Sequence, residues 1–176
     1  MEENNPQQRP APVLAIVIPC YNEEEALPLS LPVLLSLLDE MTAAGLVAAS
    51  SYILCSNDGS RDDTWGVLRR FHAADSRVHA ISLAHNRGHQ YALLAGLAEV
   101  TGQCDAAISI DADLQDDPRA MIEMVRLYRA GSDIVYGVRS SRKTDTMFKR
   151  TTAHAFYKFQ RVMGLETVYD LSLIHI

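Results

Sequence analysis

The chain has 176 residues, of which 48% are hydrophobic and 22% charged, and this size and composition are those of a single soluble globular domain. The net charge of −6 argues against a general nucleic-acid-binding protein. The three cysteines lie far apart and form no C-x-x-C pair, which indicates reduced thiols in a cytoplasmic compartment.

Strands and helices are predicted to alternate along the chain. Residues 1–12 are polar and contain prolines, so we expect a disordered leader. Apolar, β-prone runs predict five buried strands, at 13–18, 52–55, 78–83, 106–110 and 133–138. Helical spacing and capping residues predict helices after Asn22, after Asp62 or Asp63, over 90–100, from Pro118 and over 147–163. The alternation predicts an α/β fold with a mainly parallel sheet flanked by helices, whose ligands bind at the carboxyl ends of the strands.

A short acidic stretch follows the fourth predicted strand. Asp111 and Asp113 stand two residues apart there, and two carboxylates at the mouth of a buried strand are costly unless a cation lies between them. Mg²⁺ that carries substrate phosphates is the natural candidate, and Gln115 is placed to orient a metal-bound water or a phosphate. The alternative is a strand end that only solubilises the chain and caps the next helix, the role that we assign to Asp116 and Asp117.

Other polar clusters also follow predicted strands. Asp58 precedes a Gly-Ser pair and is either a turn residue or a carboxylate that accepts hydrogen bonds from a base or a ribose. Arg87 lies just before the helix at 90–100, where it suits a phosphate or carboxylate contact. His85 and His89 flank it, but no third ligand stands at usable spacing, so a zinc site is not favoured.

A basic segment follows the fifth predicted strand. Between Arg139 and Arg161 seven basic residues stand against one acid, which gives this segment a net charge of +6. It is either a solvated helix face or a site for a second anion held by Arg139, Lys143 and Arg150. A patch confined to one segment suits a phosphate ligand or an anionic membrane face better than a duplex. There is no G-x-G-x-x-G, P-loop lysine motif or nucleophile elbow, so dehydrogenase, NTPase and hydrolase functions lack their signatures.

Taken together, five stretches resemble the motifs of the family 2 glycosyltransferases, which are inverting enzymes with the Rossmann-like GT-A nucleotide-diphosphate-sugar transferase fold. The resemblance covers residues 13–170, and the stretches come in the family's order and spacing. They are Ile18–Glu24, Asn57–Asp62, Asn86–Gln90, Asp111–Asp116 and Val135–Arg139. Within the family the chain is most similar to the polyprenyl-phosphate sugar transferases, of the dolichyl-phosphate mannosyltransferase-like and bactoprenol glucosyltransferase-like types.

The resemblance implies that a sugar moves from a UDP- or GDP-sugar to a polyprenyl phosphate lipid. It implies a nucleotide-sugar site formed by Pro19, Tyr21, Glu23, Asp58, Arg87 and Asp111. It implies that Asp111 and Asp113 hold Mg²⁺ or Mn²⁺, with Gln115 as a further metal residue. Asp113 and Arg139 are then the expected catalytic residues, and the acceptor phosphate would be bound by Arg139, Lys143 and Arg150.

The chain departs from the family pattern in two places. Asn57 stands where many relatives have an acid, so Asp58 carries that site alone. Relatives continue past Asp170 into an Asp-Tyr-Arg-Leu-like segment, whose aspartate lies at the reaction centre, and many then add two membrane helices. Residues 171–176 do not continue this pattern. We therefore expect a transferase domain over 13–170 that is incomplete at its C-terminus, followed by a non-native tail at 171–176.

The expected place of action is cytoplasmic and peripheral at the inner membrane face, with the full-length form anchored by C-terminal helices. The expected partners are the nucleotide-sugar donor and the lipid acceptor, without nucleic acid, and a homo-oligomer is left open. The alternative from a different class is a non-catalytic fragment that binds a nucleotide sugar. A nucleotidyltransferase is the third candidate, but it needs a basic, Gly-rich loop that the sequence lacks. The sugar and the choice between uridine and guanosine are not determined.

Overall fold

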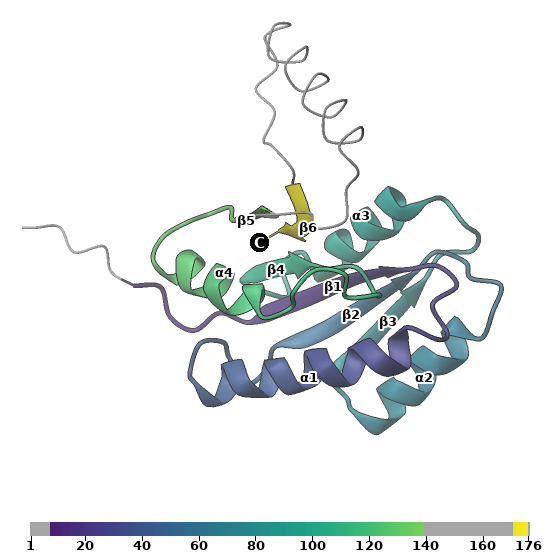
Figure 1. Ribbon diagram of the computed structural model, residues 1–176, viewed down its shortest axis with the longest axis horizontal. Coiled ribbons are helices and arrows are strands. Elements are labelled where there is room, and N and C mark those ends of the chain that lie inside the picture. Colours follow the sequence, from purple (N-terminus) through teal and green to yellow (C-terminus); the bar gives the residue numbers. More distant parts are fainter. Residues whose placement is uncertain (1–7, 139–170, 176) are drawn as a thin grey trace, which may run out of the picture.

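The computed structural model describes residues 8–138 and 171–175, which form a central sheet with helices on both faces (Figure 1). The described strands are β1 (Leu14–Cys20), β2 (Tyr52–Asn57), β3 (Val78–Ser82), β4 (Ala106–Ser109), β5 (Tyr136–Val138) and β6 (Leu171–His175). The described helices are α1 (Leu27–Ala43), α2 (Thr64–Ala74), α3 (His89–Val100) and α4 (Ala120–Arg129). The predicted alternation is confirmed over these residues, and the helix predicted over 147–163 lies outside them.

The order of the strands in the sheet is β3-β2-β1-β4-β6-β5. β1 pairs in parallel with both β2 and β4, and β2 pairs in parallel with β3. The chain thus moves outward from β1 to β3 and then returns through α3 to the opposite side of β1. Ligands of such sheets bind at the carboxyl ends of the strands where the direction reverses. In this fold that place lies between β1 and β4.

Helices pack on both faces of the sheet, and β1 serves both layers. Leu14, Ile16 and Ile18 belong to a large core that also contains residues of α1, α2 and α4. Ala15 and Val17 point to the opposite face, which α3 covers (Figure 1). The alternation follows from the two-residue period of a strand. All five side chains are fully buried, as expected for the central strand of a sheet covered on both faces.

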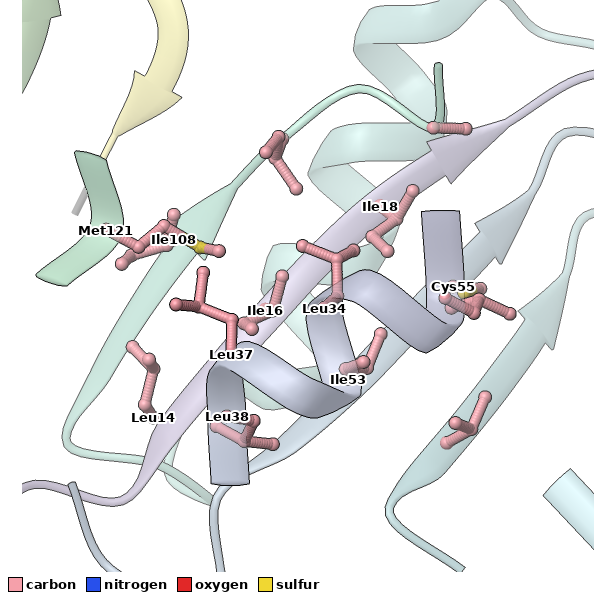
Figure 2. Close-up of a cluster of buried hydrophobic side chains, with 14 of the residues drawn as sticks. Leu14, Ile16, Ile18, Leu34, Leu37, Leu38, Ile53, Cys55, Ile108 and Met121 are labelled. Atoms are coloured by element: carbon pink, nitrogen blue, oxygen red, sulfur yellow. The ribbon is translucent and has the colours of Figure 1, made fainter. Parts of the chain in front are cut away.

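The large core joins the elements on which the strand ends depend. In Figure 2, Leu34 and Leu37 of α1 cluster with Ile16 of β1, Ile108 of β4 and Met121 of α4. None of these side chains is more than 4% exposed. Burial of one side chain of this size stabilises the fold by about 1.5–3 kcal/mol. The core therefore holds β1 and β4 firmly next to each other.

The start of α1 differs from the sequence prediction. The sequence predicts Asn22 as the N-cap, but α1 begins at Leu27, directly after Ala26. Asn22 instead has a φ of 56°, and its N–H donates to Ser60 Oγ at 2.9 Å. Its Oδ1 accepts a hydrogen bond from the N–H of Arg61, also at 2.9 Å. Because Asn tolerates left-handed backbone, these tertiary bonds keep residue 22 out of the helix.

Both predicted terminal segments have described parts that contact the domain. Arg9, within the expected leader, donates from its guanidinium to Asp133 Oδ1 at 2.6 Å and to the Ser132 carbonyl at 3.0 Å. β6, within the predicted non-native tail, pairs antiparallel with β4 and β5. The pairing shows where residues 171–175 lie in the sheet. That residues 171–176 are a non-native tail stays a prediction. Among the helices of residues 8–138, none is long and apolar enough to cross a membrane.

Candidate functional site

A cavity of about 420 Å³ opens at the carboxyl ends of β1, β2 and β4, where the sheet reverses its direction. The loop before α3 and the first turn of α3 form another side of it. The cavity is lined by Pro19, Cys20, Tyr21, Glu23, Asp58, Asn86, Gly88, His89, Gln90, Ala92, Asp111, Ala112 and Asp113. Polar clusters that are far apart in the sequence therefore meet here.

The loops after β1 and β2 are joined by hydrogen bonds that run in both directions. The N–H of Glu23 donates to Thr64 Oγ1 at 2.8 Å, and the N–H of Glu24 donates to Asp62 Oδ2 at 3.1 Å. In the other direction, the N–H of Asp63 donates to Glu24 Oε2 at 2.7 Å. Each bond satisfies a backbone donor within a loop. This side of the cavity is therefore held as one unit.

Glu23 brings a further carboxylate to the cavity, and its surroundings disfavour the charge. Partial burial, and then the negative charges of Asp113, Asp62 and Asp111, raise the pKa of the Glu23 carboxyl above its ordinary value. These carboxylates come from the loops after three different strands. Their mutual repulsion would be relieved by a cation bound between them.

The acidic stretch after β4 holds its carboxylate pair in an ordered turn. Asp111 is partly buried and Asp113 is exposed, and the buried Ala112 lies between them. Leu114 turns the chain with a φ of 49°. The Nε2 of Gln115 donates to Asp113 Oδ2 at 2.7 Å, so a neighbouring side chain orients this carboxylate. Metal-binding carboxylates are typically oriented by hydrogen bonds of this kind.

The donor atoms of this stretch fit a divalent cation only when phosphate completes its coordination. The described residues contain no group of three or more His, Cys, Asp or Glu side chains that could hold a metal ion by themselves. Mg²⁺ on a phosphate ligand needs only one or two protein carboxylates, because phosphate oxygens and waters fill the other positions. Asp111 and Asp113 line the cavity and can supply these. Gln115, whose Nε2 is bound to Asp113, keeps Oε1 as an acceptor.

α3 begins close to the acidic stretch. His89, its first residue, has its Nε2 at 4.0 Å from Asp111 Oδ1. The sequence predicts no role in the site for His89 beyond a disfavoured zinc ligand, and none for Asn86 or Gln90, which also line the cavity. The signal that could have identified Asn86 and His89 is their position between a predicted strand and the next helix, the same position that identified the carboxylates, and Gln90 is the first residue of that predicted helix.

Asp58 and Arg87 meet through the backbone of Arg87 rather than through opposite charges. Asp58 is 1% exposed, and its Oδ1 accepts a hydrogen bond from the N–H of Arg87 at 2.7 Å. Its Oδ2 accepts from the N–H of Gly88, also at 2.7 Å. The guanidinium of Arg87 lies beside the His85 ring, with Nη2 at 2.8 Å from Nε2. Arg87 is not among the described residues that line the cavity, so its contact with a nucleotide sugar stays a prediction.

Six of the predicted donor-side residues line the cavity, Arg87 and Gln115 do not, and the predicted acceptor-side residues lie outside the described ones. The predicted residues that line the cavity are Pro19, Tyr21, Glu23, Asp58, Asp111 and Asp113. Arg139, Lys143 and Arg150 lie outside the described residues, and their binding of an acceptor phosphate stays a prediction.

Comparisons with known proteins find a family, related sequences and a related fold. The family model described as "Glycosyl transferase family 2" matches residues 15–172. An "uncharacterized glycosyltransferase", YkoT, of Bacillus subtilis (strain 168) is 45% identical over 159 residues, which are 90% of this chain and 47% of the relative. The bactoprenol glucosyl transferase of Shigella phage SfX is 37% identical over 157 residues, which are 89% of this chain and 49% of that relative. The chain thus spans about half the length of these relatives.

A solved structure has the same fold. It is the mannosyltransferase PcManGT from Pyrobaculum calidifontis, in complex with GDP-Man and Mn²⁺. The two chains superpose with a TM-score of 0.53 at 17% sequence identity, over 88% of this chain and 41% of the mannosyltransferase. The likeness confirms the GT-A fold that the resemblance implies.

Proposed function

Because this chain belongs to glycosyl transferase family 2, we propose that it moves a sugar from a nucleotide-diphosphate sugar to a polyprenyl phosphate. The transfer would invert the anomeric centre and depend on Mg²⁺ or Mn²⁺. The acceptor is proposed because curated relatives, such as the SfX enzyme, are bactoprenol glucosyl transferases. The donor class is proposed because a structural neighbour is described with GDP-Man.

The observation that carries the proposal is the place of Asp111 and Asp113. Both line the cavity at the point where the strand order of the sheet reverses. His89, at the start of α3, has its Nε2 at 4.0 Å from Asp111 Oδ1. The N-terminus of a helix favours negative charge, as does a cation held by two carboxylates. A diphosphate placed between the acidic stretch and α3 would be stabilised from both sides.

Different residues of the cavity are then proposed to bind different parts of the donor. Pro19, Tyr21, Glu23 and Asp58 are proposed to surround the base and the ribose, since they lie at the end of β1 and in the two loops that are joined as one unit. Arg87 is proposed to add a contact to the phosphates. The proposal does not choose between uridine and guanosine.

Asp111, Asp113 and Gln115 are proposed to hold the metal ion on the diphosphate. When bound, the ion would act as a Lewis acid that neutralises the charge growing on the leaving diphosphate. The residues themselves keep the diphosphate in one position, with Gln115 orienting Asp113. Asp113 is therefore proposed as a catalytic residue.

The acceptor needs little activation by the protein. A lipid phosphate oxygen is ionised at neutral pH, so it can attack the anomeric carbon from the face opposite the leaving group. The new bond joins that oxygen to the carbon, the bond from the carbon to the diphosphate oxygen breaks, and the nucleoside diphosphate leaves. Arg139, Lys143 and Arg150 are proposed to bind the acceptor phosphate, and Arg139 to assist catalysis.

The acceptor also suggests where the protein works. A polyprenyl phosphate resides in a membrane, and a basic segment with a net charge of +6 is suited to an anionic membrane surface. We therefore propose that residues 13–170 form a transferase domain that works on the cytoplasmic membrane face, and that the full-length polypeptide is anchored there.

The donor side can be tested by thermal unfolding. UDP or GDP with Mn²⁺ should raise the Tm of the wild-type chain, because a ligand that binds only the folded state stabilises it. Asp113→Ala should remove most of this rise. Asp117→Ala is the matched control, because Asp117 accepts a hydrogen bond from the N–H of Arg119 at the start of α4. If neither nucleotide shifts the Tm, the donor site is refuted.

The acceptor side needs a transfer assay. Incubation with labelled UDP- or GDP-sugar and a short polyprenyl phosphate should yield a lipid-linked sugar. The assay should use this chain and also a polypeptide that is extended to the length of the relatives. Nucleotide binding without transfer in this chain, and transfer in the longer one, would favour the alternative of a binding fragment. The absence of transfer in both would refute the lipid acceptor.

A further inference from the structure

We infer that Asp58 is a positioning residue, which fixes the loop before α3 and thereby the cavity wall that faces the acidic stretch. Its carboxylate acts on the backbone of Arg87 and Gly88, in addition to lining the cavity. The inference rests on the proposed function for the identity of the ligand. The contacts that carry it lie within the protein.

The first support is the use of the Asp58 carboxylate. Asp58 is only 1% exposed. A carboxylate can be buried at low cost only when it is well hydrogen-bonded. Each oxygen accepts one backbone N–H, from Arg87 and from Gly88, at 2.7 Å. Bonds from N–H groups to a charged oxygen are about twice as strong as neutral ones. The N–H of Asp58 donates to the carbonyl of Cys20 at 2.8 Å, so the backbone that carries the carboxylate is itself anchored to β1.

The second support is the backbone contact made by the next residue. Gly59 has a φ of 62°, and a Cβ added to it would lie 2.6 Å from both the Cα and the carbonyl carbon of His85. It would also lie 2.8 Å from the backbone nitrogen of Asn86. Only glycine allows this approach and this backbone conformation together. Two successive residues therefore hold the loop over residues 85–88, Asp58 by hydrogen bonds and Gly59 by close backbone contact.

The third support is the exposure of this loop. Residues 84–87 are exposed, and exposed loops with few buried contacts are the first parts of a protein to open. Gly88 is followed at once by His89, whose Nε2 lies 4.0 Å from Asp111. The hydrogen bond from Gly88 to Asp58 thus sets the distance between the start of α3 and the acidic stretch. On the proposed function, this is the space for the diphosphate of the donor.

Two variants disturb the contacts of residues 58 and 59 with the loop in different ways. Asp58→Asn keeps the shape of the side chain but places an NH₂ group against a backbone N–H. Gly59→Ala keeps the carboxylate and pushes the loop away from it. Gly102→Ala is the matched control, because Gly102 also has a positive φ, of 78°, but a Cβ there meets no atom within 4 Å. It reproduces the backbone strain without the clash.

Two measurements should be made on each variant. Hydrogen exchange of the ligand-free protein should show faster exchange at the amides of Arg87 and Gly88 in Asp58→Asn and Gly59→Ala, by about 10- to 100-fold, the loss expected for a bond to a charged group. Calorimetric titration with UDP and with GDP, in the presence of Mn²⁺, should show affinity lowered by about tenfold or more in the same two variants. Gly102→Ala should change neither quantity.

The outcomes separate this inference from the proposed function. Weaker binding by Asp58→Asn with unchanged exchange, or full binding by a Gly59→Ala chain whose loop exchanges faster, would overturn the positioning role. Unchanged exchange in both variants would overturn it as well. If the exchange rates of the two variants rise as expected but the wild-type chain binds neither nucleotide, the proposed donor site is wrong. The role of Asp58 in positioning the loop would then still stand. If Asp58→Asn does not fold, Gly59→Ala decides the matter by itself.

Discussion

The Nε2 of Gln115 donates a hydrogen bond of 2.7 Å to Oδ2 of Asp113, so one side chain of the acidic stretch orients another. The Oδ1 of Asp113 also faces the backbone N–H of Gln115, at 3.3 Å. Asp113 is exposed, and an exposed carboxylate without such partners would rotate freely. The pair therefore gives a direction to the carboxylate that is proposed to bind the metal ion.

Gln115→Ala should weaken the metal dependence of nucleotide binding without abolishing it. The loss of a partner that orients a metal ligand typically costs 10- to 100-fold in metal affinity, and we expect about tenfold here because Asp113 is exposed. Asp113→Ala should cost more. The measurement is the affinity for UDP or GDP as a function of Mn²⁺ concentration. The proposed metal site would be wrong if Asp117→Ala, which removes an acceptor at the start of α4, changed the Mn²⁺ dependence equally.

Glu23→Gln should stabilise the ligand-free chain at neutral pH. Partial burial and neighbouring carboxylates raise the pKa of Glu23 in the folded state, so the folded chain keeps this proton to a higher pH than the unfolded chain. Stability is therefore lost as pH rises from the ordinary value of 4.5 through the raised pKa. The amide removes this loss. We expect a gain of about a few tenths of a kcal/mol at pH 7, because the group is partly solvated.

The gain from Glu23→Gln has a clear pH signature. It should vanish well below the ordinary pKa of a Glu carboxyl, where Glu23 is protonated in both the folded and the unfolded chain. Thermal unfolding between acidic and neutral pH measures it. Glu25→Gln is the control, since Glu25 is exposed and the substitution removes the same charge. A gain that is equal in both variants would assign the effect to net charge rather than to the cavity.

The position of the site could be predicted from the sequence because it depends on periodicity and topology. The apolar run of β1 and the run before Asp111 identify two buried parallel strands. In a parallel sheet all such strands end on one side, so the polar residues that follow them must converge. Pro19, Asp58 and Asp113 are far apart in the sequence and line one cavity for this reason.

The local details could not be predicted because they depend on long-range hydrogen bonds. Asn22 has the sequence pattern of a helix cap, but it is held by Ser60 and Arg61 from the loop after β2. Arg87 has the pattern of an anion contact, but its backbone is bound by Asp58, which lies 29 residues earlier. The sequence predicts the fifth strand over 133–138, but β5 begins only at Tyr136, after the exposed Ile134, where it pairs with His175 of β6. No local pattern contains these partners.

Gly96→Ala should destabilise the chain, although alanine is the better helix former. A Cβ at Gly96 of α3 would lie 2.6 Å from Cγ1 of Val17 in β1, where neither the buried strand nor the helix can move freely. Overpacking of this kind typically costs about 1–3 kcal/mol. Gly66→Ala in α2 is the matched control, because the three atoms nearest to a Cβ there all belong to the exposed side chain of Asp63, which can turn away toward solvent. Denaturant unfolding should give opposite signs for the two variants, since helix propensity favours alanine by up to about 1 kcal/mol.

Arg9→Ala should lower the Tm more than an ordinary surface Arg→Ala substitution. The guanidinium of Arg9 lies 4.6 Å from the centre of the Tyr128 ring and donates to carbonyl oxygens just after α4, those of Gly131 and Ser132. It thereby satisfies backbone acceptors of the segment that follows α4. Its ion pair with Asp133 is a minor part, because the Asp133 side chain is 87% exposed and such pairs contribute little.

Two controls separate the carbonyl contacts of Arg9 from its charge. Arg70→Ala breaks an ion pair with Asp63 in which both side chains are exposed, and it should leave the Tm almost unchanged. Asp133→Asn removes the negative partner of Arg9 but leaves the carbonyl oxygens in place, so it should also have a small effect. If Asp133→Asn lowered the Tm as much as Arg9→Ala, the ion pair would be the main contact. A fall confined to Arg9→Ala would instead show that the segment before β1 is fastened to the end of α4 through the carbonyls of residues 131–132 and the Tyr128 ring.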